Sequence, residues 1–393
     1  MRPNPALIAL SLTMLVPSLS ISVATVGLPS IADELEVGVA AVQWVVIAYL
    51  LATTTLIVGA GRLGDLFGRR RVLRGGIAVF TAATLLCGLA PDLPLLIAAR
   101  ALAGIDAAAV MALSIAFVGD AVPRDRTGRA MGLLGTMSAI GTALGPAIGG
   151  ALLEVSGWRA LFLAVVPLAV AAGALSRVLP EPAAGRRAAP RGLSTPRTPG
   201  LVANAVVSAV VMTTLVVGPF HLGALGLAPG LVGLVMSVGP VVSALTGVPA
   251  GRATDRHGAR GVALVGLAGV VAGTALLAVA PTSVVGYAVP LAVVTASYAL
   301  FQAANNTAVM ADVPADRRGA VSGVLTLSRN LGLMTGALAM GAAFAALAGP
   351  SPTPADITGA TRWTFAIASA VVALALAARV GASAVRGAER PVI

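Results

Sequence analysis

The chain has too few charged residues to cover a water-facing surface. Charged residues make up only 10% of the 393 residues, aromatic residues make up 4%, and lysine is absent. A soluble chain of ordinary composition carries about 25% charged residues, so a soluble enzyme is excluded. Intrinsic disorder is excluded too, because 58% of the residues are hydrophobic and disorder requires low hydrophobicity.

Cysteine and histidine are also scarce. The single cysteine, Cys87, lies in an apolar segment, and the only histidines, His221 and His257, are not spaced as metal ligands. We therefore expect neither a disulfide framework nor a metal site. The chain has no phosphate-binding loop of the type G-x-x-x-x-G-K-[ST], so we expect no nucleotide and no other cofactor.

The sequence does contain many long apolar segments. A membrane-spanning helix needs about 20 apolar residues, and twelve such segments are bounded by charge, proline or glycine. They lie near residues 5–28, 42–60, 75–90, 94–118, 128–152, 160–178, 201–220, 230–250, 261–280, 284–310, 319–348 and 363–385. The sequence therefore predicts an all-α membrane protein with 12 transmembrane helices. The first segment is too long for the apolar core of a signal peptide and lacks a cleavage site, so we expect it to be retained.

The arginines predict the orientation of these helices. All 26 basic residues are arginine and the net charge is +11. If the N-terminus is inside, 22 arginines fall on the cytoplasmic side and only Arg159 and Arg362 fall on the other. Basic residues gather on the cytoplasmic side of membrane proteins. We therefore expect both termini to be cytoplasmic in the cell inner (plasma) membrane, with lipid rather than nucleic acid beside the arginines.

The chain also repeats itself. The segment 60–70 recurs as 250–260, at an offset of 190, and Pro123 to Gly128 recur as Pro314 to Gly319, at an offset of 191. Two independent loops thus share nearly the same shift. The sequence predicts two pseudo-symmetric six-helix bundles, 1–179 and 200–393, joined by a cytoplasmic linker at 180–199 that is rich in proline and arginine.

Three motifs carry a resemblance to a known family. They are the loop Gly61-x-Leu63-x-Asp65-x-x-Gly68-Arg69-Arg70, the pair Arg100-x-x-x-Gly104, and the run Gly141-x-x-x-Gly145-Pro146-x-x-Gly149-Gly150. On these residues the chain resembles the major facilitator superfamily and, within it, the bacterial drug:proton antiporters. The resemblance implies two six-helix bundles around a central cavity, and a transport cycle in which one bundle rocks against the other.

The resemblance also implies roles for single residues. Asp65 is expected to dock on the N-terminus of the eleventh helix near Gly319, and the repeat suggests that Asp255 docks near Gly128. Pro146, with its neighbouring glycines, is expected to act as a bend or hinge for antiport. The alternatives are that Asp65 and Asp255 are solvated loop acids, and that Pro146 is an ordinary kink in a packing helix.

Ionisable residues inside a membrane are costly and functional by default. Arg100, Asp106 and Arg329 fall within the predicted spans. Asp106 lies about 18 Å into the fourth span, which makes it our leading proton carrier, while a structural carboxyl bonded to a neighbouring helix is the alternative. Arg100 matches the arginine that the family implicates in proton transfer, but Ser20 stands where the family has an acid. Arg329 could simply pin backbone carbonyls.

Polar residues also line one side of several predicted helices. We expect a substrate cavity formed by Ser22, Thr25, Asn204, Tyr298, Gln302, Asn305 and Asn306. A lone hydroxyl in a membrane helix usually bonds its own backbone, so Tyr298, Gln302 and Asn306 are the better candidates. Two rows of small residues, Gly141, Gly145 and Gly149 in the fifth span and Gly239, Ser243 and Gly247 in the eighth, are expected to pack against each other.

Together these features predict a secondary transporter. We expect a monomer that exports small apolar or amphiphilic compounds in exchange for protons, without enzymatic activity. A proton symporter or uniporter for a nutrient, such as a sugar or an organic anion, is the alternative. A non-transporting sensor would need a soluble domain or a long tail, and a membrane enzyme would need a cluster of acids, histidine or serine; the sequence shows neither.

Overall fold

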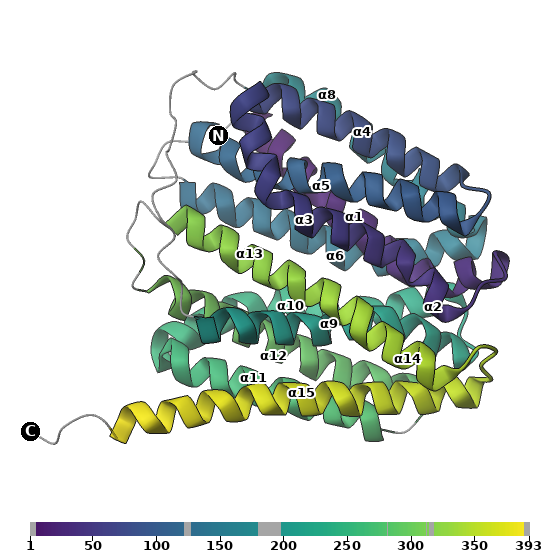
Figure 1. The fold of residues 1–393 in the computed structure, drawn as a ribbon, viewed down its shortest axis with the longest axis vertical. Coiled ribbons are helices and arrows are strands. Elements are labelled where there is room, and N and C mark those ends of the chain that lie inside the picture. Colours follow the sequence, from purple (N-terminus) through teal and green to yellow (C-terminus); the bar gives the residue numbers. More distant parts are fainter. Residues whose placement is uncertain are drawn as a thin grey trace, which may run out of the picture. The chain divides into compact units, whose positions relative to one another are not determined.

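The computed structural model describes residues 5–121, 127–179, 198–280, 282–311, 313 and 318–388. The regular elements of these ranges are all helices (Figure 1). The first group is α1 (Pro5–Glu34), α2 (Val39–Val42), α3 (Trp44–Phe67), α4 (Arg69–Leu89), α5 (Leu93–Ala121), α6 (Thr127–Ser156), α7 (Trp158–Leu163), α8 (Val165–Leu175) and the 3₁₀ turn η2 (Ser176–Val178). The second is α9 (Thr198–Ala224), α10 (Pro229–His257), α11 (Ala259–Val279), α12 (Val284–Met310), α13 (Arg318–Thr335), the π-helical η3 (Gly336–Met340), α14 (Gly341–Ala348) and α15 (Pro354–Ala388).

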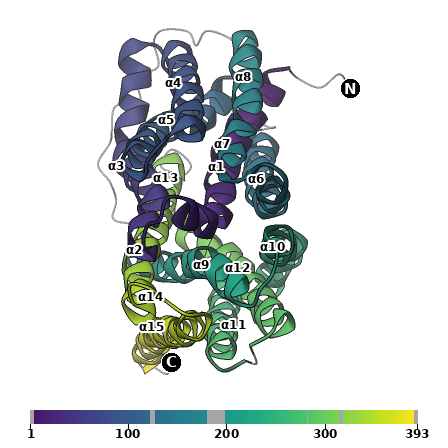
Figure 2. The same ribbon diagram turned by 90° about the vertical axis from the view of Figure 1, so that its right-hand side faces the viewer.

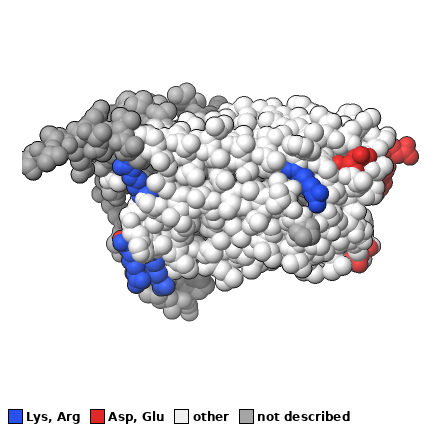
Figure 3. Space-filling model, turned by 90° about the horizontal axis from the view of Figure 1, so that it is seen from below, with Lys and Arg blue, Asp and Glu red and all other residues white. Residues whose placement is uncertain are grey.

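The helices are long and apolar enough to cross a membrane. Among the described residues, 11 helical segments meet that requirement, and α6 adds a shorter apolar stretch at Ile140–Ser156. Each of the twelve predicted spans falls on one of these helices, so the all-α transmembrane prediction is confirmed. Figure 3 shows one face on which two arginine patches lie at one end and acids lie at the other, with a further arginine patch near the acids and an otherwise largely uncharged surface.

The sixth span differs from its prediction because it is interrupted at Ala164, between α7 and α8. Pro167 follows three residues later. A proline ring clashes with the carbonyl four residues before it and removes one backbone donor. In this chain that carbonyl belongs to Leu163, the last residue of α7. The interruption therefore follows from the position of Pro167.

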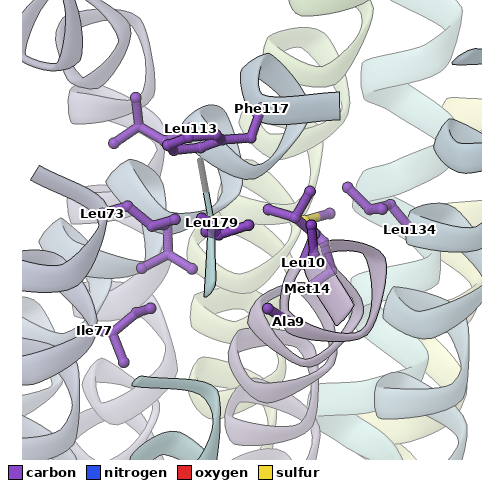
Figure 4. Packing of buried hydrophobic residues seen from close by; sticks show 11 residues of the cluster. Ala9, Leu10, Met14, Leu73, Ile77, Leu113, Phe117, Leu134 and Leu179 are labelled. Carbon is purple, nitrogen blue, oxygen red and sulfur yellow. The ribbon is translucent and has the colours of Figure 1, made fainter. Parts of the chain in front are cut away.

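The chain divides into two compact units. Unit 1 is Met1–Arg191 with Gly226–Ser237, and unit 2 is Gly192–Leu225 with Val238–Ile393. The predicted linker lies almost entirely outside the described residues, so the boundary at 180–199 stays a prediction. In unit 1, α1, α4, α5 and α6 pack around a hydrophobic cluster that includes Leu10, Phe117 and Leu179. Figure 4 shows Leu179 between side chains of α1, α4 and α5.

The two units share local features at the repeat offset. Gly68 separates α3 from α4 with φ +90°, and Gly258 separates α10 from α11 with φ +81°. A side chain at this φ is strained, so each sharp turn requires glycine. Glycines of α6 also pack on α1 in unit 1, as glycines of α13 and η3 pack on α9 in unit 2. The predicted internal repeat is therefore visible in backbone conformation and in helix pairing.

Candidate functional site

Arg100 of α5 is the most completely buried charged side chain described in unit 1, with 0% of its surface exposed. Its Nε donates to the carbonyl of Val45 in α3 at 3.0 Å, and its Nη1 donates to the hydroxyl of Ser20 in α1 at 3.0 Å. The guanidinium also lies 4.3 Å from the centre of the Tyr49 ring. Arg100 therefore ties three helices together.

The same region explains the glycine that follows Arg100 by four residues. A Cβ added at Gly104 would lie 3.0 Å from the Tyr49 carbonyl carbon and still closer to its oxygen, so only glycine allows α5 to approach α3 here. The Thr53 hydroxyl donates to the Gly104 carbonyl at 3.0 Å, and the Tyr49 hydroxyl donates to the Pro17 carbonyl at 3.2 Å. The motif Arg100-x-x-x-Gly104 thus joins α1, α3 and α5.

Asp106 faces a different neighbour. Its backbone oxygen lies 3.8 Å from the Cβ position of Gly76 in α4, and its side chain is half-buried. Its Oδ2 is buried and has no hydrogen-bond partner within the described part of the chain. Asp106 therefore lies on the α4 side of α5, whereas Arg100 reaches α1 and α3, so the two residues do not share a face. Its role as proton carrier stays a prediction.

The proline-containing motif of α6 packs mainly on α1. A Cβ at Gly141 would lie 3.1 Å from the Ser18 Cβ, and one at Gly145 would lie 3.0 Å from the Ser22 carbonyl carbon. Hydroxyls follow the same contact: Ser18 bonds Ser138 at 2.6 Å, and Ser22 donates to the Thr142 carbonyl at 2.8 Å. Close backbone approach and interhelical hydrogen bonds both favour association in lipid.

The predicted pairing of the two small-residue rows is wrong. The Gly141, Gly145 and Gly149 row faces α1, and Gly239 packs beside Thr295 of α12. A row of small residues allows close approach but does not specify the partner. On α1 the hydroxyls of Ser18 and Ser22 find partners on α6, and the pairing follows them. Gly150 turns to another neighbour: its Cβ position lies 2.9 Å from the Cα of Gly233, in the first turns of α10, which belong to unit 1.

The α1–α6 contact predicts a large difference between two glycines. Gly145→Ala should lower the free energy of unfolding by about 1–3 kcal/mol, the usual effect of overpacking a close contact. Gly247→Ala is the matched control, because its Cβ would meet nothing within 4 Å, and we expect a change within about 0.5 kcal/mol. Thermal unfolding of both purified variants in detergent measures the difference. Equal melting temperatures would contradict the assigned contact.

In unit 2, Asn204 connects α9 with α13. Its side-chain amide donates to the Leu325 carbonyl at 3.0 Å, and Ser328 of α13 donates to the Leu201 carbonyl at 2.6 Å. The Oδ1 of Asn204 is buried and has no partner within the described residues. Arg329, the next residue along α13, is half-buried.

The predicted stripe on α12 divides into two groups. Tyr298 and Gln302 are half-buried, and the Gln302 amide donates to the Tyr298 hydroxyl at 3.1 Å. Asn305 is fully buried and accepts a bond from Arg379 of α15 at 2.7 Å, while Asn306 is exposed. Asn305 thus connects α12 with α15. Asn306 points in another direction, because consecutive residues of a helix are about 100° apart around its axis.

The remaining predicted residues lie on α1 and in the two loops. Thr25 is buried and donates to the Ser22 carbonyl at 2.8 Å, so it bonds its own helix. Gly61 lies in α3, and Arg69 begins α4. The side chain of Asp65 and the surroundings of Gly128 and Gly319 lie outside what the structure describes. Asp255 is exposed at the end of α10. Both docking contacts therefore stay predictions.

Sequence reasoning missed several partners. Ser138, Thr142, Ser328 and Arg379 complete the hydrogen bonds described above. Ser138 and Thr142 are four residues apart on α6, as Ser18 and Ser22 are on α1, and this matched spacing was the available signal. Tyr49, which the candidate residues of the sequence analysis did not include, is buried beside Arg100.

The sequence and the fold of the chain are similar to those of several known transport and resistance proteins. The chain is 26% identical over 396 residues to the riboflavin transporter RibZ of Clostridioides difficile (strain 630), covering 84% of this chain and 86% of that protein. It is 39% identical over 163 residues to the multidrug resistance protein Stp of Mycobacterium tuberculosis (strain CDC 1551 / Oshkosh), covering 41% of this chain and 30% of that protein. Its fold matches a bacterial homolog of the human lysosomal transporter Spinster with a TM-score of 0.84, at 17% identity over 97% of both chains.

The family follows from a match that spans nearly the whole chain. The Major Facilitator Superfamily profile matches residues 10–337 and residues 200–391. The second match begins inside the first, as expected of a chain whose halves repeat one design. The helices, the repeated glycine turns and the buried arginine lie within these matched ranges, and the chain belongs to the Major Facilitator Superfamily.

Proposed function

We propose that this transporter exports small apolar or amphiphilic compounds, such as drugs or antibiotics, in exchange for protons. Alternating access, in which one bundle rocks against the other around a midplane site, is the mechanism typical of such folds. The observation that carries the proposal is the fit of the α6 motif to α1. Gly141 and Gly145 approach Ser18 and Ser22 closely, beside a proline at position 146.

Pro146 distinguishes this helix from its counterpart in unit 2. Gly332 and Gly336 keep the glycine spacing and pack on α9, but Ala337 stands where α6 has its proline. Unit 2 has a π-helical segment at this place, Gly336–Met340. Packing symmetry alone would treat both halves alike, so the proline supports a role beyond packing. The resistance protein Stp, which matches part of the chain, supports the same direction.

The remaining parts of the proposal concern energy and location. We propose that the proton gradient drives transport without a nucleotide or another cofactor, and that the protein acts as a monomer in the plasma membrane and not as an enzyme. Its partners are then a small-molecule substrate, protons and membrane lipid. The distribution of arginines supports cytoplasmic N- and C-termini.

Nutrient uptake is the second candidate, either by proton symport or by facilitated diffusion. It is favoured by the similarity to RibZ, a riboflavin transporter, which covers most of both chains. The polar groups Asn204, Tyr298 and Gln302 would suit a polar substrate as well as an amphiphilic one. Export by antiport and uptake by symport differ in the direction in which protons move with the substrate, whereas facilitated diffusion moves no protons.

Everted membrane vesicles distinguish the candidates by the sign of one signal. Respiration acidifies the vesicle interior, and dyes, antibiotics, riboflavin and sugars are then added one at a time. An antiporter should make the interior less acidic when its substrate enters, whereas a symporter should make it more acidic. Vesicles from the same host without the protein are the control. Acidification by a nutrient, with no response to any dye or antibiotic, would overturn the export proposal.

A further inference from the structure

A hollow of about 860 Å³ lies between α4 and the segment formed by α8 and η2. The two helices pack side by side in unit 1, as Figures 1 and 2 both show. Four arginines line this hollow: Arg70, Arg71 and Arg74 from α4, and Arg177 from η2. The other lining residues are apolar or small, apart from Thr81. The hollow is therefore strongly basic on one part of its wall and apolar on the rest.

The sequence of α4 creates this division. Leu73, Ile77 and Phe80 are buried, and the first two belong to the core of unit 1. Arg70, Arg74 and Ala78 follow one another at steps of four residues, which places them on one stripe of the helix beside that core face. On the opposite wall, Ala169, Gly173 and Arg177 repeat the same step. Small residues thus keep the space open where larger side chains would close it.

The basic part of the wall is lined without an acid among the residues that the structure describes. No aspartate or glutamate of the described ranges is among the lining residues. The Arg70 Nη2 donates to the Arg177 carbonyl, which holds the side chain across the gap between the helices, and its Nε is buried with no partner within the described residues. Arg70, Arg71 and Arg74 also stand in the first two turns of α4, where the helix dipole disfavours positive charge. An anion in the hollow would neutralise this charge.

The apolar part of the wall extends from the arginines into the membrane-spanning part of α4. Ile77, Ala169 and Val170 contribute to it, and Val170 is 56% exposed. The preference of arginine for one side of the membrane explains its presence at this end, but it does not explain an adjoining apolar hollow. A free phosphate or a nucleotide would leave the apolar wall uncovered. An anionic phospholipid would cover both the basic and the apolar part of the wall, since its headgroup is anionic and its chains are apolar.

We propose that this hollow binds an anionic phospholipid from the adjacent leaflet. Arg70, Arg74 and Arg177 contact the phosphate, and an acyl chain lies along the apolar wall toward Thr81. Basic pockets between membrane helices are a recognised way of binding anionic headgroups. The proposal is independent of the transport direction, since it concerns the outer contact of α4 and α8 and not the substrate.

Native mass spectrometry of the purified full-length protein tests the headgroup contact. Phosphatidylglycerol should bind more tightly than phosphatidylcholine with the same chains. Arg70→Gln, Arg74→Gln and Arg177→Gln together should weaken phosphatidylglycerol binding roughly 100-fold, given the attraction that each arginine contributes. The matched control replaces Arg252, Arg256 and Arg260, which removes the same charge from the repeated loop. Equal affinity for both lipids, or equal losses in both triple variants, would overturn the proposal.

A second variant separates a lipid from a free anion. A Cβ at Gly75 would meet nothing within 4 Å, so Gly75→Leu should fold normally and fill part of the hollow. We expect it to weaken phosphatidylglycerol binding at least about tenfold while leaving the affinity for inorganic phosphate unchanged. If Gly75→Leu binds the lipid as the wild type does, and phosphate competes fully with it, the hollow is an anion site only and the proposal fails.

Discussion

Replacement of Arg100 by glutamine is expected to cause a large loss of both stability and transport. Two hydrogen bonds from a charged donor, to Val45 and Ser20, would be lost or weakened. Such bonds contribute about 1.5–3 kcal/mol each, and the cation–π contact with Tyr49 about 2 kcal/mol when desolvated. The free energy of unfolding should therefore fall by at least about 3 kcal/mol. Thermal unfolding in detergent and substrate-driven proton flux measure the two effects.

Arg100→Lys separates the charge from its geometry. Lysine keeps the positive charge, but its single ammonium cannot place two planar donors on α1 and α3 while stacking on Tyr49. We expect this variant to remain unstable and nearly inactive. Arg159→Gln is the comparison at a half-exposed site, since Arg159 pairs with Glu34 and lies 4.4 Å from the centre of the Trp158 ring. At exposed sites an ion pair and a cation–π contact each contribute about 1 kcal/mol or less. Wild-type stability in Arg100→Lys would show that only the charge matters and would contradict the proposed three-helix contact.

The sequence predicted the helices well because lipid imposes a simple rule. Every spanning segment must satisfy its own backbone hydrogen bonds, so length and hydropathy suffice to locate it. Seven prolines inside α1, α6, α9, α10 and α12 do not end these helices. Among the prolines that the structure describes within a predicted span, only Pro167 coincides with an interruption, between α7 and α8. Hydropathy therefore locates a span but does not predict whether a proline within it interrupts the helix, because that depends on how the local backbone accommodates the proline.

Side-chain partners were much harder to predict than helices. The polar residues of α12 were predicted to share one face and one cavity. In the structure Tyr298 bonds Gln302 of the same helix, whereas Asn305 bonds Arg379 of α15. Arg379 lies 74 residues from Asn305, and no local pattern relates the two. The glycine row of α6 correctly indicated a close contact, but its partner depended on the hydroxyls of α1. Spacing within one helix reveals a face, whereas the partner of that face depends on the packing of the whole unit.

Asp106→Asn is expected to abolish proton coupling while leaving the fold intact. Asparagine has nearly the same shape, and Oδ2 makes no hydrogen bond within the described residues that the change would break. An amide cannot take up and release a proton, so substrate-driven proton flux should fall about 100-fold. Binding of a dye to the purified protein should stay close to the wild-type affinity. Fluorescence of a pH indicator in everted vesicles, together with dye titration, measures both quantities.

Two further variants decide whether the carboxyl itself carries the proton. Asp106→Glu restores an ionisable group on the α4 side of α5 and should recover part of the coupling. Asp33→Asn makes the same chemical change at an exposed acid in the last turn of α1 and should leave coupling unchanged. If Asp106→Asn still couples substrate to protons, the proton moves through another group. In that outcome Asp106 would be a structural carboxyl, since an unpaired acid inside a membrane helix is retained only for a role in packing or in function.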